Sequence, residues 1–154
     1  MSAVQCALVA LATLALAAPA GAAAVQPWDQ AKVTELGQQL EATMKELSDT
    51  FRRQPPPTVG SGQSRSYYRL QQQIRQIRTE ARSLSRSLQK GAGHDETLPG
   101  FESMMQTIRL AQDEARRVFS TTEVRDKAAA AREVLNQLMP YYDAEAAPLE
   151  PVQR

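Results

Sequence analysis

Apolar side chains recur in steps of three and four, without a miss, along the stretch from Tyr67 to Leu88. The repeating positions are Tyr67, Leu70, Ile74, Ile77, Ala81, Leu84 and Leu88. Residues three and four apart lie on the same side of an α-helix, so this spacing is typical of a helix with one apolar face. The pattern therefore predicts a helix over residues 65–90, which Gly91 ends because glycine easily adopts a left-handed cap conformation.

The same spacing predicts a helix on the N-terminal side, over residues 27–53. Pro27 suits its first position, where the missing N–H is not needed. Its inward positions are Val33, Leu36, Leu40, Met44, Leu47 and Phe51. Three prolines from Pro55 stop it, because proline lacks the backbone donor and clashes with the preceding turn. The segment from there to Ser64 is expected to be either a crossover or a flexible loop.

Two more helices are predicted over residues 99–119 and 121–139. The first follows Pro99, and its inward set includes Phe101, Met104, Met105, Ile108, Ala111, Ala115, Val118 and Phe119. The second begins where Ser120 precedes Glu123 by three residues, the spacing of a capping box. The intervening turn is very short, so one uninterrupted helix remains an alternative. Beyond Pro140 we expect at most one further turn.

These four one-sided helices predict the fold class. No stretch alternates with period two, and aromatic residues make up only 5% of the chain. Four helices that each bury one face pack most economically against each other, as an all-α, antiparallel, up-down-up-down four-helix bundle over residues 25–142. Many seam positions are alanine, which permits close helix approach but leaves a thin core. Residues 143–154 are expected to form a frayed tail.

The first 24 residues have the features of a cleaved secretory signal. No charged side chain occurs before Asp29, Ala7 to Ala18 is almost entirely Ala, Leu and Val, and Ala22 to Ala24 offers an Ala-x-Ala cleavage site. The apolar run is about half of the roughly 20 residues that a membrane-spanning helix needs. We therefore expect a periplasmic protein whose mature chain lacks Cys6, the only cysteine, and with it any disulfide or Cys-ligated metal.

Charge is concentrated on the second predicted helix. The whole chain has a net charge of +1, whereas residues 65–90 hold seven basic side chains against the single Glu80. One face of this helix presents an arginine stripe, defined as Arg75, Arg78, Arg82 and Arg86. The stripe is either balanced by acids on neighbouring helices or is a docking surface for an acidic protein or the anionic surface of the envelope. Export disfavours nucleic acid as the partner, and a homodimer remains an open alternative.

No metal centre or catalytic constellation is predicted. His94 is the only histidine, and a zinc or copper site would need further nitrogen or sulfur ligands that its neighbourhood lacks. We therefore expect a solvated loop histidine. The methionines Met44, Met104, Met105 and Met139 are expected in the core, although a thioether copper site is an alternative. Ser candidates lack a histidine base, and Asp113 and Glu114 point away from each other on a helix. We expect no enzyme activity.

Residues 100–142 resemble the cytochrome b562 family of periplasmic four-helix bundles. The resemblance begins at Gly100-Phe101-Glu102, continues through an alanine-rich last helix from Val124 to Ala131, and reaches Tyr141-Tyr142. That family holds haem between a methionine in its first helix and a histidine near the end of its last. The matching positions here are Val33 and Tyr142; valine cannot ligate iron, and tyrosine works best as a phenolate.

These observations predict a haem-free, non-enzymatic binding or accessory protein that has lost the family's ligands. No cofactor is expected. The alternatives are an electron-transfer protein that holds haem b through Tyr142 or a methionine, and a methionine-based copper carrier.

Overall fold

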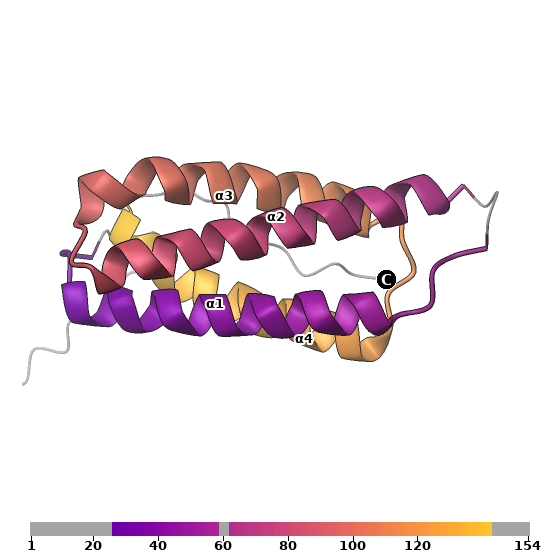
Figure 1. The fold of residues 1–154 in the computed structure, drawn as a ribbon, viewed down its shortest axis with the longest axis horizontal. Helices are drawn as coiled ribbons and strands as arrows, with labels where there is room; N and C mark the ends of the chain where they lie inside the picture. The colour runs from indigo at the N-terminus through magenta and orange to yellow at the C-terminus, as the bar shows by residue number, and fades with distance from the viewer. Residues whose placement is uncertain (1–25, 59–61, 143–154) are drawn as a thin grey trace, which may run out of the picture.

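The computed structural model describes residues 26–58 and 62–142, and in it four helices form a bundle in which each runs antiparallel to the helix before it (Figure 1). They are α1 (Gln30–Arg53), α2 (Ser64–Gln89), α3 (His94–Ala115) and α4 (Thr122–Leu138), and a short 3-10 helix, η1 (Met139–Tyr142), follows α4. This confirms the predicted all-α four-helix bundle. The predicted signal at 1–24 and the tail at 143–154 lie outside the described residues. No helix in the described part is long and apolar enough to cross a membrane.

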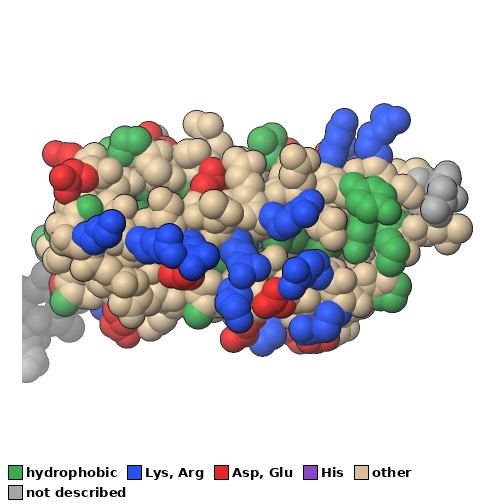
Figure 2. Space-filling model, viewed as in Figure 1, with side chains coloured by type: hydrophobic (Ala, Val, Ile, Leu, Met, Phe, Trp, Pro, Cys, Tyr) green, Lys and Arg blue, Asp and Glu red, His purple; other side chains and the backbone are tan. Residues whose placement is uncertain are grey.

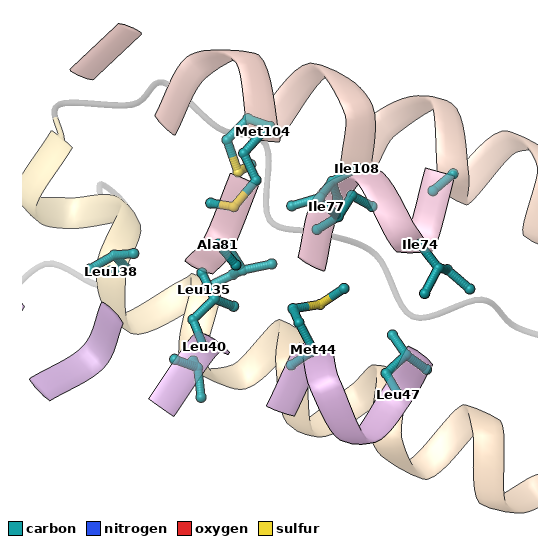
Figure 3. Close-up of a cluster of buried hydrophobic side chains, with 14 of the residues drawn as sticks. Leu40, Met44, Leu47, Ile74, Ile77, Ala81, Met104, Ile108, Leu135 and Leu138 are labelled. Atoms are coloured by element: carbon teal, nitrogen blue, oxygen red, sulfur yellow. The ribbon is translucent and has the colours of Figure 1, made fainter. Parts of the chain in front are cut away.

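The apolar faces predicted from the sequence form the core. All seven α2 seam residues from Tyr67 to Leu88 are buried, and so are the six predicted on α1. In Figure 3 the side chains of Met44, Ile77 and Ile108 point toward one another from three helices. Burying such side chains is the main favourable term in folding, at about 1.5–3 kcal/mol for each large one. The sequence pattern thus identifies the buried face of both helices.

The bundle is closed at one end, which we call the proximal end, where α1 begins and η1 lies. The ring of Tyr142 stacks on Phe101 with centroids 4.1 Å apart, and Trp28 meets Tyr142 edge-on at 5.4 Å. The backbone N–H of Gln26 donates to the carbonyl of Pro140 at 2.9 Å, which ties the chain before α1 to η1. Trp28 and Tyr142 therefore cover the end of the bundle where α1 begins.

The helix pairs do not pack equally. Helix α1 packs against α2 and α4, α2 packs against α3, and η1 contacts both α3 and α4. The fourth pair of neighbours, α3 and α4, is not among the closely packed pairs. Three interfaces between neighbouring helices are therefore closely packed, and the fourth, between α3 and α4, is open. We call this loosely packed interface the open seam; it lies toward the opposite, distal end, where α1 ends and α4 begins.

Two predicted helix starts are wrong. Helix α1 begins at Gln30 rather than 27, because the Asp29 carboxylate accepts a hydrogen bond from the Lys32 N–H at 3.0 Å and caps the helix. Helix α3 begins at His94 rather than 99. Glu96 accepts a hydrogen bond from the Gly93 N–H at 2.9 Å, which caps the helix before Pro99.

Pro99 therefore lies inside α3, in its second turn. Its missing N–H leaves the carbonyl four residues earlier, that of Asp95, without its intrahelical partner. Asp95 is exposed, so water can satisfy this oxygen. A proline that was expected to precede the helix is tolerated because it lies close to the N-terminus and faces solvent.

The connection between the last two helices also differs from the prediction. Helix α3 ends at Ala115, four residues before the predicted 119, and α4 starts only at Thr122. The cap of α4 is Thr121, whose hydroxyl accepts from the Val124 N–H at 3.3 Å, and not Ser120. The alternative of one continuous helix is wrong, because the chain turns back between α3 and α4.

Candidate functional site

The open seam between α3 and α4 leads into an apolar cleft of about 570 Å³ in the distal half of the bundle. A volume of this size lies within the range of small-molecule sites. All four helices contribute to it. Its apolar lining includes Met44, Leu47 and Phe51 of α1, Leu70, Ile74 and Ile77 of α2, Ile108, Ala111 and Ala115 of α3, and Val124, Ala128, Ala131 and Leu135 of α4.

Alanines explain why this seam stays open. Ala111 and Ala115 face the cleft from α3, and Ala128 and Ala131 face it from α4. A methyl group fills little space, so two alanine faces close a seam only where the helix backbones approach each other. Here α4 packs against α1 instead. Alanines on the helix faces permit close approach but leave a thin core, and between α3 and α4 the thin core is the outcome.

The distal end of the cleft is held by Gln54, the C-cap residue of α1, which the sequence pattern did not single out. Its side-chain N–H₂ donates to the carbonyl of Phe119 at 2.9 Å, and its side-chain oxygen accepts from the Thr121 N–H at 3.1 Å. Its own carbonyl accepts from the Tyr67 hydroxyl at 3.2 Å. Gln54 is buried, so these bonds form in a site where an unpaired polar group is costly. They attach the α3–α4 loop to the ends of α1 and α2.

An exposed aromatic ring lies at the mouth of the cleft. Phe119 lines the cleft, and its side chain is 64% exposed. The prediction that it points inward with the α3 seam is wrong, because α3 ends before it. Phe51, deeper in the cleft, stacks on Tyr67 with ring centroids 5.0 Å apart. Aromatic surface is therefore available at one end of the site, part of it open to solvent.

Two arginines of α4 lie at the edge of the cleft, Arg125 and Arg132, together with Asp126. Arg125 donates to the Thr122 hydroxyl at 3.1 Å. Neither Arg132 nor Asp126 forms an ion pair within the described residues. The edge therefore has a net positive charge next to an apolar interior, which favours a ligand with an apolar body and an anionic end.

The arginine stripe lies on a different face of the molecule. Figure 2 shows basic side chains along the face to which α2 contributes, with acidic ones among them. Two of the four arginines are paired with α1, since Arg78 lies 3.7 Å from Asp49 and Arg82 lies 3.7 Å from Glu41. This confirms that neighbouring helices balance part of the stripe.

The other two arginines of the stripe, Arg75 and Arg86, are exposed and form no ion pair within the described part of the chain. They are therefore the members of the stripe that remain available to an anionic partner.

The two positions identified through the cytochrome resemblance both lie at the proximal end, away from the cleft. Val33 is fully buried. The Tyr142 hydroxyl shares a hydrogen bond of 2.9 Å with Thr97, and its ring is stacked on Phe101. Burial raises the pKa of the Tyr142 phenol, against a smaller opposing effect of the Thr97 hydrogen bond. The residue is thus held in the protonated form, which is a poor ligand for haem iron.

His94 is not the solvated loop residue that was expected. It is the first residue of α3, its side chain is 32% exposed, and its ring packs against Trp28 and Tyr142. The physical reason is the helix cap at Gly93, which turns the histidine toward the proximal aromatic cluster. Its Nδ1 lies 2.7 Å from a carboxylate oxygen of Asp95. No group of three or more acidic, histidine or cysteine side chains gathers into a metal site within the described residues.

The four methionines of the copper alternative are all buried, as expected for core residues. Met44 lines the cleft, whereas Met104, Met105 and Met139 do not. The structure therefore separates Met44 from the others as a potential ligand contact.

Comparisons of this chain with protein-family models, with curated proteins and with solved structures find no match, so the likeness to cytochrome b562 stays a prediction.

Proposed function

We propose that this chain is an exported, non-enzymatic binding protein that takes up an elongated amphiphile with an apolar chain and an anionic end, of the fatty-acid type. The observation that carries the proposal is the apolar cleft between α3 and α4. A packed bundle interior ordinarily leaves few voids larger than a water molecule, so an opening of about 570 Å³ into the core is an unusual feature that suits a ligand.

The shape of the cleft favours an elongated ligand. Its lining extends along α4 from Val124 to Leu135, which corresponds to about 16 Å of helix. Each methylene that moves from water into such a site contributes about 0.8 kcal/mol. Arg132 and Arg125 at the edge can meet a carboxylate there while the chain lies among the aliphatic side chains. A partly exposed ion pair of this kind contributes up to about 1 kcal/mol.

The test is a titration of the mature protein, residues 25–154, with cis-parinaric acid, a fatty acid that fluoresces when it enters an apolar site. We expect saturable one-to-one binding. Ala111→Leu combined with Ala128→Leu should abolish it by filling the cleft. Ala130→Leu is the matched control, since Ala130 is exposed and does not line the cleft.

Arg132→Gln should weaken binding of the fatty acid about threefold and leave binding of a neutral apolar dye unchanged. Binding of cis-parinaric acid that does not saturate would exclude the cleft as the site. Equal binding by the parent and by the variant with both Ala111→Leu and Ala128→Leu would exclude it too.

A second candidate is a docking surface for an anionic partner, favoured by the exposure of Arg75 and Arg86. Such a surface predicts salt-sensitive binding to vesicles that contain phosphatidylglycerol. Arg75→Glu with Arg86→Glu should remove this binding without loss of helicity. Unchanged vesicle binding by that variant would remove the stripe from consideration.

The haem alternative has its own test, a titration of the mature protein with haem followed by visible absorption. A saturable Soret shift that is lost in Tyr142→Phe would favour the electron-transfer protein.

A further inference from the structure

The described residues leave the apolar cleft uncovered, while the chain continues for twelve residues beyond Tyr142. We propose that this tail, residues 143–154, docks in the cleft between α3 and α4 as a polyproline-type extended segment and competes with the ligand. The inference rests on the cleft of the proposed function but not on the identity of its ligand.

The tail has the residue pattern that such docking requires. Pro148 and Pro151 disfavour a helix interior, and proline suits the polyproline conformation that we propose for the docked tail. That conformation has three residues per turn, so residues three apart lie on one side. Leu149 and Val152 then share one side and Glu150 shares another with Gln153. The segment would present its apolar sides to the cleft and its polar side to the charged edge of the cleft and to water. Proline-rich segments of this kind bind grooves that contain aromatic side chains.

The length of the tail matches the position of the cleft. Tyr142 packs against Trp28 at the proximal end. Helix α4 lies between that end and the distal end (Figure 1). Leu149 is seven residues beyond Tyr142, a distance of about 22 Å in the polyproline conformation. Ala129, which lines the cleft, is also about 21 Å from Tyr142, measured back through η1 and α4. A tail that runs back along α4 therefore brings Leu149 level with Ala129.

Charge supports the same register. Glu150 would be about 25 Å from Tyr142, and Arg125 at the cleft edge is about 27 Å away along α4. The two side chains are long enough to meet across that difference. The tail contains three acidic residues and one basic residue, and the cleft edge contains two arginines and one aspartate. The opposite net charges favour this arrangement over solvent.

Disulfide formation tests the docking without any ligand. In the mature chain, which lacks Cys6, Leu149→Cys is paired with Ala129→Cys or, as the matched control, with Ala130→Cys. Positions 129 and 130 are both exposed and adjacent, but only Ala129 lines the cleft. We expect intramolecular oxidation to be at least about tenfold faster with position 129. Equal rates, or disulfide-linked dimers in place of the intramolecular bond, would overturn the proposal, the latter because a second copy would then be the occupant.

Competition is measured with the neutral dye N-phenyl-1-naphthylamine. Leu149→Asp with Val152→Asp should remove the tail from the cleft and tighten dye binding about fivefold to tenfold. Ala144→Asp with Ala147→Asp is the matched control, because those positions share the polar side with Glu150. Equal affinity of the two variants would overturn the competition. Selective cross-linking with no dye binding in any variant would support the docked tail and refute the proposed ligand function.

Discussion

Enlarging one alanine of the cleft should stabilise the protein, whereas enlarging an alanine elsewhere in the core should destabilise it. Ala128 lines the cleft and is half-buried, and Ala81 is fully buried and does not line the cleft. The sequence gives both positions the same description, an alanine on the apolar face of a helix. The structure distinguishes them by the space in front of each side chain.

The magnitudes follow from the two environments. Ala128→Leu adds three carbons, worth about 2.4 kcal/mol if they are fully buried. Only part of this is gained in an open cleft, and ordering the leucine costs about 0.5–1 kcal/mol. We therefore expect the free energy of unfolding to rise by about 1 kcal/mol. Ala81→Leu inserts the same carbons where there is no room, and overpacking of this kind costs about 1–3 kcal/mol.

Urea unfolding followed by far-UV circular dichroism measures both changes. Ala130→Leu is the reference for a leucine on the exposed face of α4 and should remain within about 0.5 kcal/mol of the parent protein. Fatty-acid binding should fall in Ala128→Leu and remain unchanged in Ala130→Leu. A loss of stability in Ala128→Leu as large as that in Ala81→Leu would refute the reasoning, because it would mean that the cleft is closed in solution.

Three further outcomes test the structure around the cleft and at the proximal end. Gln54→Ala should lower the free energy of unfolding by about 2 kcal/mol, measured by urea unfolding, because two part-buried hydrogen bonds to the α3–α4 loop are lost. A change below a few tenths of a kcal/mol would show that the loop is held by other contacts. Tyr142→Phe should cost about 1 kcal/mol through the lost bond to Thr97. Because burial raises the pKa of Tyr142 above 10.0, the parent should also lose stability as the pH rises past that value, and the variant should lose less. A hydrogen bond from Ser66 holds the pKa of Glu114 below its usual 4.5, so the stability from this group is present above that pH and is lost as the pH falls through the folded-state pKa. The midpoint of urea unfolding should therefore fall less with decreasing pH in Glu114→Gln than in the parent. The same pH dependence of the midpoint in both proteins would contradict the assignment.

The sequence determined the faces that α1 and α2 bury, but it left open whether the residues after Pro99 form one helix or two. The seam of α2 is correct at every position, because a helix with a period of 3.6 residues must place residues three and four apart on one side. The left-handed turn after α2 was also predictable at Gly91, whose φ is 86°. These features depend on neighbours along the chain, and local spacing contains that information.

Helix starts were less predictable, since a capping interaction competes with the helix-breaking character of proline. Pro99 was expected to precede α3, but the hydrogen bonds around Gly93 start the helix five residues earlier. Asp29 similarly replaced Pro27 as the start signal of α1. In both cases an acidic side chain that satisfies a free backbone N–H decided the boundary.

Only the tertiary structure decided where the bundle stays open. The alanines of α3 and α4 are compatible with close packing or with a cleft, and no pattern along one helix states how far away its neighbour lies. That distance is fixed by residues remote in sequence, such as Gln54, which holds the α3–α4 loop, and by the aromatic contacts that close the proximal end. The sequence therefore specified four amphipathic faces, whereas the cleft arises from the way those faces are placed relative to one another.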